Sequence, residues 1–154
     1  MIRTPTIPRA TIDDLHNVEG KAELIAGRIV PIMPTGSHPA RMGGRIYKAM
    51  DDYSLLTERG IAYPDGAGFA VPELANGRES FSPDAAYFAG YVADGDMNFI
   101  DGPPTVAVEV RSKGDYGPSA EYEMALKRAD YFEAGTLVVW DVDPIAETVS
   151  VSRA

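Results

Sequence analysis

Two acidic residues stand at the ends of two expected strands, where carboxylates can do chemistry. Asp84 follows Phe81-Ser82-Pro83, and Glu109 follows the apolar run Val106-Ala107-Val108. A carboxylate at the end of a buried strand is costly to desolvate unless it is paired or binds a cation. Two such carboxylates predict a site for a hard divalent ion, because Mg²⁺ often takes one or two protein carboxylates together with water and substrate phosphate. The alternative is that Asp84 caps a turn and Glu109 pairs with an arginine.

The composition excludes several other kinds of site. The chain has no cysteine, so it has no disulfide, thiolate zinc site or cysteine nucleophile. It has two histidines, His16 and His38, too few for a multi-histidine metal centre. The N-terminus lacks an apolar signal region and no apolar run reaches membrane-spanning length, so we expect a cytoplasmic protein without membrane contact.

The net charge of −9 is unfavourable for binding nucleic acid, since such binding relies on Lys and Arg that neutralise phosphates. The cations must therefore be concentrated locally, or binding must be weak or depend on a partner. Arg41, Arg45 and Lys48 form one stripe on an expected helix and could follow a nucleic-acid backbone. A solvated helix face is the other meaning of such a stripe.

The pattern along the chain predicts one α+β domain over residues 1–154, with a single mixed sheet and helices packed on it. Residues 1–10 are proline-rich and are expected to form an extended arm. Helices are expected from Thr11 as N-cap, over about 39–58 with Ser37 or His38 near the N-cap and Gly60 as C-cap, and over about 120–134 ending at Gly135. A hairpin is expected at Glu23–Val30, with the turn at Ala26-Gly27. Further strands are expected near 61–63, 69–71, 84–88, 105–110, 137–142 and 148–151, and long loops at 89–104 and 113–119.

These segments together resemble a known family. Pro83-Asp84 followed by Glu109-Val110-Arg111 is similar to the PD-(D/E)xK nuclease signature, with Arg111 where a lysine usually stands. The succession of Glu109–Ser112, Lys127–Gly135 and Val139–Pro144 resembles the Uma-two family of restriction-endonuclease-like proteins. Glu23–Val30 and Ser37-His38 fit the same pattern, so the resemblance covers nearly the whole chain. A short motif alone has a high false-positive rate, whereas the ordered set of segments is stronger evidence.

The resemblance implies a restriction-endonuclease-like core and a Mg²⁺- or Mn²⁺-dependent endonuclease with DNA as its substrate. Asp84 and Glu109 would hold the metal, with the backbone carbonyl of Val110 as a further ligand. Lys127 matches a helix lysine of the family and would orient the attacking water, while Arg111 would stabilise charge on the phosphate. Lys127 could instead be a surface lysine, and Lys113 is the weaker alternative for its role.

Two further residues match the family pattern. Glu23 would add a third carboxylate ligand or a contact that supports the ligands, unless it is a charge at a strand edge. His38 would contact a phosphate or cap a helix. Arg41, Arg45 and Lys48 are the expected nucleic-acid-binding face.

Two rival functions stay open at this stage. The first is a catalytically inactive nucleic-acid- or protein-binding member of the same fold, which the missing lysine at Arg111 and the negative charge favour. The second is a dimeric assembly module with a structural acidic cluster. The resemblance implies a homodimer, and an open sheet edge at Thr148–Val151 favours pairing. Family members usually continue past Ala154, so we expect a C-terminus that is shortened relative to the family.

Overall fold

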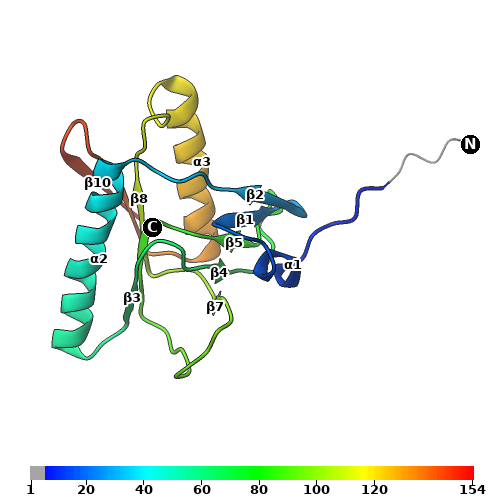
Figure 1. Cartoon of the computed structure of the whole chain (residues 1–154), viewed down its shortest axis with the longest axis horizontal. Coiled ribbons are helices and arrows are strands. Elements are labelled where there is room, and N and C mark those ends of the chain that lie inside the picture. The colour runs from blue at the N-terminus through cyan, green and yellow to red at the C-terminus, as the bar shows by residue number, and fades with distance from the viewer. Residues whose placement is uncertain (1–5) are drawn as a thin grey trace, which may run out of the picture.

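The computed structural model describes residues 6–154 (Figure 1). Residues 6–10 have no helix or strand, as expected for the arm, and the rest of the predicted arm lies outside the described residues. The helices are α1 (Ile12–His16), α2 (Ser37–Thr57) and α3 (Pro118–Ala134). The strands are β1 (Ala22–Ile25), β2 (Arg28–Pro31), β3 (Ile61–Tyr63), β4 (Phe69–Ala70), β5 (Ser80–Phe81), β6 (Ala85–Phe88), β7 (Ile100–Asp101), β8 (Val106–Val110), β9 (Val138–Asp143) and β10 (Thr148–Arg153).

Within residues 6–154 the strands form three sheets, so the expectation of a single mixed sheet is wrong. The main sheet has five strands in the order β10-β9-β8-β6-β3, and it is mixed because β8 and β9 are parallel. The hairpin β1-β2 and the small sheet β5-β4-β7 are separate. Strands β4, β5 and β7 have two residues each, and β5 and β7 are missing from the prediction because so short a segment carries no periodicity.

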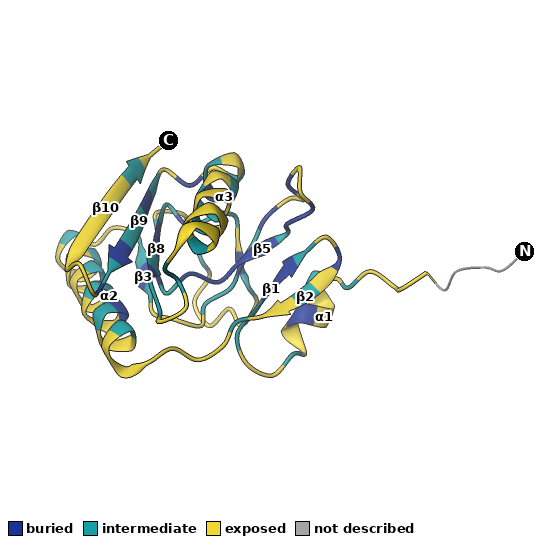
Figure 2. Cartoon of the chain, turned by 90° about the horizontal axis from the view of Figure 1, so that it is seen from above, coloured by how far each residue is buried: buried dark blue, intermediate teal, exposed yellow. Residues whose placement is uncertain are grey.

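The main sheet has a helix on each face, as Figures 1 and 2 show. One core lies under α2, where Met42 and Ile46 pack against Val108 and Val110 of the sheet. The other core lies on the side of α3, where Tyr131 packs with Ala107, Val139 and residues of the small sheet. Side chains alternate between the two faces along each strand, which decides which residues can meet α3.

The helix ends agree with the sequence in two places and differ in two. Thr11 caps α1 through a capping box, and Gly135 ends α3 in the left-handed conformation, as expected. The N-cap of α2 is Gly36, so the expected caps Ser37 and His38 are instead the first two residues of the helix. It ends at Glu58 in the left-handed conformation rather than at Gly60. Gly60 has φ +65° and lies against Tyr87, so it serves the turn into β3.

No helix in the described part of the chain is long and apolar enough to cross a bilayer.

Candidate active site

The pleat of β8 turns Glu109 toward α3. Ala107 belongs to the core on the α3 side, and Val108 and Val110 belong to the core under α2. Glu109 therefore shares the face of Ala107, because side chains two residues apart lie on the same face of a strand. Its partner in the parallel strand β9 is Asp141. The sequence predicted Glu109 at the end of a strand. The alternation of side chains between the two faces of β8 explains why Glu109 faces α3 and not α2.

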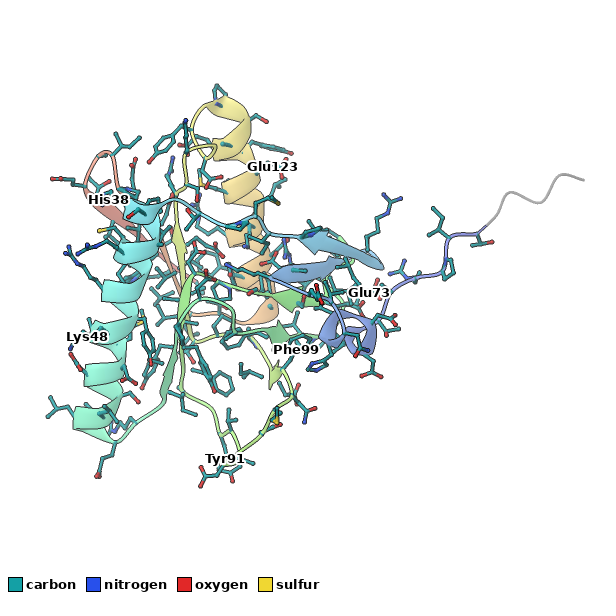
Figure 3. The ribbon with its side chains drawn as sticks, in the orientation of Figure 1. His38, Lys48, Glu73, Tyr91, Phe99 and Glu123 are labelled. Carbon is teal, nitrogen blue, oxygen red and sulfur yellow. The ribbon has the colours of Figure 1, made fainter. Side chains whose placement is uncertain are left out.

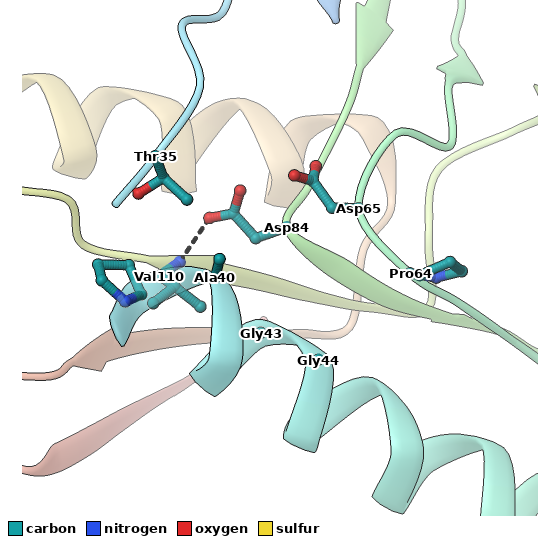
Figure 4. Close-up of a pocket in the computed structure, with 9 residues that line it drawn as sticks. Thr35, Ala40, Gly43, Gly44, Pro64, Asp65, Asp84 and Val110 are labelled. Atoms are coloured by element: carbon teal, nitrogen blue, oxygen red, sulfur yellow. Dashed lines mark hydrogen bonds between the residues drawn. The ribbon is translucent and has the colours of Figure 1, made fainter. Parts of the chain in front are cut away.

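Asp84 stands directly before β6 and is fixed by the neighbouring strand. Its backbone N–H donates to the Val108 carbonyl at 2.9 Å, and its Oδ2 accepts from the Val110 N–H at 2.7 Å (Figure 4). Its Oδ1 pairs with Lys21 Nζ at 3.0 Å, and the same ammonium lies 2.6 Å from Asp65. Val110 thus contacts Asp84 through its backbone N–H, whereas the sequence analysis considered its carbonyl as a metal ligand. Asp84 does not cap the turn after Pro83; it links β6 to the end of β8.

Glu109 is held by two side chains of α3. Its Oε1 lies 2.9 Å from Lys127 Nζ and accepts a hydrogen bond of 2.6 Å from the Tyr131 hydroxyl. Burial raises the pKa of Glu109, as do the nearby Asp84 and Glu23 carboxylates, and the Lys127 ammonium offsets only part of this. Its other oxygen, Oε2, has no hydrogen-bond partner among residues 6–154. Glu109 pairs with a lysine, and the alternative pairing with an arginine is not observed.

Lys127 bridges two carboxylates. Its ammonium lies 2.9 Å from Glu109 and 3.0 Å from Glu23, and its side chain is 23% exposed. Burial by itself would lower the pKa of Lys127, but the Glu109 and Glu23 carboxylates outweigh it and hold the pKa well above its ordinary value. Lys127 is therefore a permanent cation in this arrangement and is not free at the surface.

Glu23 is buried and has a partner for each oxygen. Its Oε2 accepts from Arg78 at 2.6 Å, and its Oε1 accepts from the Ser82 N–H at 2.9 Å while facing Lys127. Burial would raise the pKa of Glu23, but Lys127 and Arg78 lower it below the ordinary value. Glu23 is therefore a buried residue with charged and backbone partners, and it is not a charge at an exposed strand edge.

One cavity of about 780 Å³ joins these groups. Its wall includes the following charged residues: Lys21, Glu23, Asp84, Glu109, Arg111 and Lys127. Two strand-end carboxylates in one cavity suit a hard cation that also keeps water and substrate oxygens. Across residues 6–154, no group of three or more acidic or histidine side chains is arranged to hold a metal ion by itself. The described part of the chain therefore contains no closed carboxylate cage.

Arg111 lines the same cavity but is engaged by acidic partners. Its guanidinium binds Asp141 through Nε at 3.0 Å and Nη2 at 2.8 Å, and it also pairs with Glu121. The Asp141 and Glu121 hydrogen bonds raise the pKa of Arg111. Lys113 is exposed and does not contribute to the cavity wall. The structure thus brings Lys127, and not Lys113, to the two carboxylates.

The expected nucleic-acid-binding residues lie apart from these groups. His38 is exposed in the first turn of α2, and Arg41, Arg45 and Lys48 are exposed farther along that helix. Lys48 pairs with Asp52 at 2.9 Å (Figure 3). None of these four residues lines the 780 Å³ cavity, since α2 covers the other face of the sheet. A smaller cavity of about 210 Å³ connects the start of α2 with Asp84, and Pro39, Ala40, Gly43 and Gly44 contribute to its wall (Figure 4).

Sequence reasoning missed two cations and one hydroxyl of the site. Lys21 and Arg78 contact its carboxylates, and the Tyr131 hydroxyl donates to Glu109. Lys21 and Glu23 stand two residues apart at the start of a strand, so a shared face could have been inferred. Arg78 forms an isolated β-bridge with Ile25 but lies far from Glu23 in sequence, and no local pattern joins the two residues.

A mixed sheet with a helix on each face and acidic residues at the ends of adjacent strands defines a restriction-endonuclease-like fold. Comparison with protein families finds the model of Uma2, described as "Putative restriction endonuclease", over residues 10–154. The chain belongs to this family, which confirms the resemblance drawn from its motifs. Among solved structures, the chain is similar to one described as "a putative nuclease belonging to DUF820" from Anabaena variabilis ATCC 29413. The TM-score is 0.69 at 20% identity, over 93% of this chain and 79% of the other. A search of curated proteins finds no match.

Proposed function

We propose that this protein is a divalent-metal-dependent endonuclease that hydrolyses phosphodiester bonds in DNA. The observation that carries the proposal is the meeting of Asp84, Glu109 and Lys127 in one cavity, with Lys127 2.9 Å from Glu109. Membership of the Uma2 family, described as "Putative restriction endonuclease", supports the same class of reaction. The chemistry needs anionic ligands for a metal and a cation near the reacting phosphate, and the two carboxylates and Lys127 in one cavity support this assignment.

Asp84 and Glu109 would hold Mg²⁺ or Mn²⁺, and the Val110 carbonyl is proposed as a further ligand. Such an ion supplies an activated water and neutralises charge on the phosphoryl group. Both residues would hold the ion through their carboxylates, and the Asp84 carboxylate also pairs with Lys21 at 3.0 Å. We assign Lys127 to orienting the water and to stabilising negative charge, because its ammonium lies beside Glu109 and Glu23 at the cavity wall.

Arg111 is proposed to contribute charge to the phosphate while it remains bound to Asp141. Its second carboxylate partner, Glu121, has a side chain that is 56% exposed, so the phosphate can compete for that part of the guanidinium. The exposed face of α2 with His38, Arg41, Arg45 and Lys48 is proposed as the surface that follows the DNA backbone. It lies beside the smaller cavity, which opens toward Asp84.

The deciding experiment is nicking of supercoiled plasmid in Mg²⁺, in Mn²⁺ and in EDTA. We expect nicking with either ion, none in EDTA, and none from the isosteric variants Asp84→Asn and Glu109→Gln. Asp52→Asn removes a carboxylate at the exposed end of an α2 ion pair and should cut like the wild type. Nicking that persists at the wild-type rate in both active-site variants would show that neither Asp84 nor Glu109 is needed and would refute the proposal.

A non-catalytic DNA-binding function is the second candidate, and the state of Arg111 favours it. Arg111 stands two residues after Glu109 and binds the carboxylates of Asp141 and Glu121. An arginine cannot serve readily as a base. Fluorescence anisotropy with labelled duplex distinguishes the two functions. DNA binding that depends on Arg41 and Arg45, without nicking in any metal, would support the second candidate.

We also propose a homodimer, with β10 as the contact. This strand is one edge of the main sheet and is mostly exposed (Figure 2). Its residues Val149 and Val151 are 48% and 49% exposed. Exposed strand edges with apolar side chains tend to be covered or paired. Two sites in one particle would suit cleavage of both strands of a duplex.

A further inference from the structure

We propose that Glu23 and Arg78 are positioning residues for Lys127, an inference that rests on the function proposed above. Glu23 faces the Lys127 ammonium with Oε1 at 3.0 Å. Arg78 Nη1 binds Oε2 of the same carboxylate at 2.6 Å. The pair thereby fixes the cation that stands beside Glu109.

Both oxygens of Glu23 are already engaged by protein partners. Its Oε1 already accepts from the Ser82 N–H at 2.9 Å and faces Lys127, while Oε2 is held by Arg78. The Glu23 side chain is 6% exposed, and the Arg78 side chain is 7% exposed. Turning Glu23 toward a metal would leave the Arg78 charge buried without this partner, which is strongly unfavourable. Of the two roles that the sequence left open, Glu23 thus takes the supporting one.

The contacts form a closed circuit between α3 and β1. Arg78 Nε donates to Asp130 at 2.8 Å, and Asp130 stands three residues after Lys127 on α3. The circuit runs from Asp130 through Arg78 and Glu23 to Lys127 and returns along the helix. Charges alternate in sign along these three contacts, so Arg78 and Glu23 are each attracted by both of their neighbours. An arginine suits the central place because its planar fork binds two carboxylates at once.

The backbone places Arg78 rigidly between the hairpin and the helix. The Ala26 N–H donates to the Gly77 carbonyl at 2.8 Å, and the Glu79 N–H donates to the Leu24 carbonyl at 2.9 Å. Gly77 has φ +87°, and a Cβ there would lie 2.8 Å from the Ala26 Cα. On the other side, the Asn76 amide donates to Asp130 at 2.9 Å. Hydrogen bonds on both sides therefore hold the segment that carries Arg78.

A second anchor for Lys127 matters because its first anchor is a proposed metal ligand. Lysine has a flexible four-carbon stem, and Glu109 alone would hold its head. A cation bound at Glu109 would repel the ammonium and weaken that ion pair. Glu23 is tied to Arg78 on its far side, so it keeps Lys127 at the cavity wall when the Glu109 contact weakens.

The test compares Glu23→Gln, Arg78→Lys and Glu133→Gln in the full chain. Glu23→Gln keeps the shape and removes the charge, while Arg78→Lys keeps the charge and removes the fork. Glu133→Gln is the matched control, since Glu133 lies on α3 and accepts from the Ala75 N–H of the same turn without touching Lys127. Three quantities are measured: the ¹H–¹⁵N signal of the Lys127 ammonium, the Mn²⁺ affinity by calorimetry, and the kinetics of nicking.

We expect the Lys127 ammonium signal in the wild type and the control, and its loss by rapid exchange in Glu23→Gln. Mn²⁺ affinity should be retained in Glu23→Gln and lost in Glu109→Gln. kcat should fall roughly 10- to 100-fold in Glu23→Gln, the scale of removing a residue that orients an active group, while KM is retained. Arg78→Lys should lie between the wild type and Glu23→Gln.

Two results would overturn the inference. One is loss of Mn²⁺ binding in Glu23→Gln to the same extent as in Glu109→Gln, which would make Glu23 a metal ligand. The other is an unchanged Lys127 signal in Glu23→Gln, which would show that Glu109 alone positions the lysine. A folded wild type that binds Mn²⁺ but does not cut DNA would refute the proposed function. The ammonium signal would still show whether Glu23 positions Lys127.

Discussion

Lys127 of helix α3 and Glu109 of strand β8 are joined by an ion pair of 2.9 Å across the face of the main sheet. The pair brings a cation that stays protonated next to a carboxylate whose pKa is raised by burial. In the proposed reaction, Glu109 would help to hold the metal ion and Lys127 would stabilise negative charge.

Metal binding should depend on Asp84 and Glu109 together. We expect the wild type to bind Mn²⁺ and to gain thermal stability from it, about 2.7 kcal/mol at a hundredfold excess over Kd, because the ion binds the folded state. The Asp84→Ala, Glu109→Ala double variant should show neither effect in calorimetry and thermal melting. The control Asp52→Asn should respond like the wild type. Equal binding by the double variant would remove this metal assignment.

Cleavage should depend on Lys127 and not on Lys113. Replacing Lys127 by Met should lower the nicking rate roughly 10²-fold, the scale of losing one positioned group that stabilises charge. Lys113→Met should have little effect, because Lys113 is exposed and does not line the cavity. Rates are compared in a plasmid assay after both variants are shown to fold. If Lys127→Met keeps full activity and Lys113→Met loses it, the role belongs to Lys113 and our assignment to Lys127 is wrong.

Arg111 should contribute to stability more than to cleavage. Arg111→Ala leaves Asp141, whose side chain is 14% exposed, without its two hydrogen bonds. We expect the free energy of unfolding to fall by about 1–3 kcal/mol, the usual range for a group that loses its partner. Lys48→Ala breaks an exposed ion pair and should change stability little. Chemical denaturation measures both, and a larger loss of nicking from Arg111→Ala than from Lys127→Met would reverse the roles assigned above.

Acid should weaken the fold partly through Glu23. Its pKa is lowered in the folded state, so its contribution to stability is present above the ordinary pKa of 4.5 and is lost as pH falls through the lower value of the folded state. The unfolding free energy of Glu23→Gln should therefore decline less steeply than that of the wild type below that pH. Denaturation curves across the acidic range give both slopes. Parallel slopes would mean that Glu23 titrates alike in the folded and unfolded chain.

The edge strand β10 should mediate dimer formation. Light scattering at micromolar concentration should give a dimer mass for the wild type and a monomer mass for Val151→Lys, since a charge on an edge disfavours pairing. Leu56→Lys changes a side chain that is 85% exposed on α2 and should leave the mass unchanged. A monomer mass for the wild type at every accessible concentration would end the dimer proposal and would favour nicking over double-strand cleavage.

Local sequence features determined the elements, the family and the two principal acidic residues. Apolar runs and helix caps such as Thr11 and Gly135 depend on only a few neighbouring residues. They therefore predicted the main helices and strands closely. The strand-end position of Glu109 and the helix position of Lys127 were likewise evident, because the motif segments of the family carry them.

Only the tertiary structure decided which charges meet. Glu23 and Arg78 are 55 positions apart, and Lys21 and Asp84 are 63 apart, so no local period links them. Their contacts arise because the hairpin β1-β2 and the turn before β5 are folded against the sheet end, which brings separate loops to one cavity. The short strands β5 and β7 escaped prediction for the same reason, since pairing with β4 creates them and their own sequence does not.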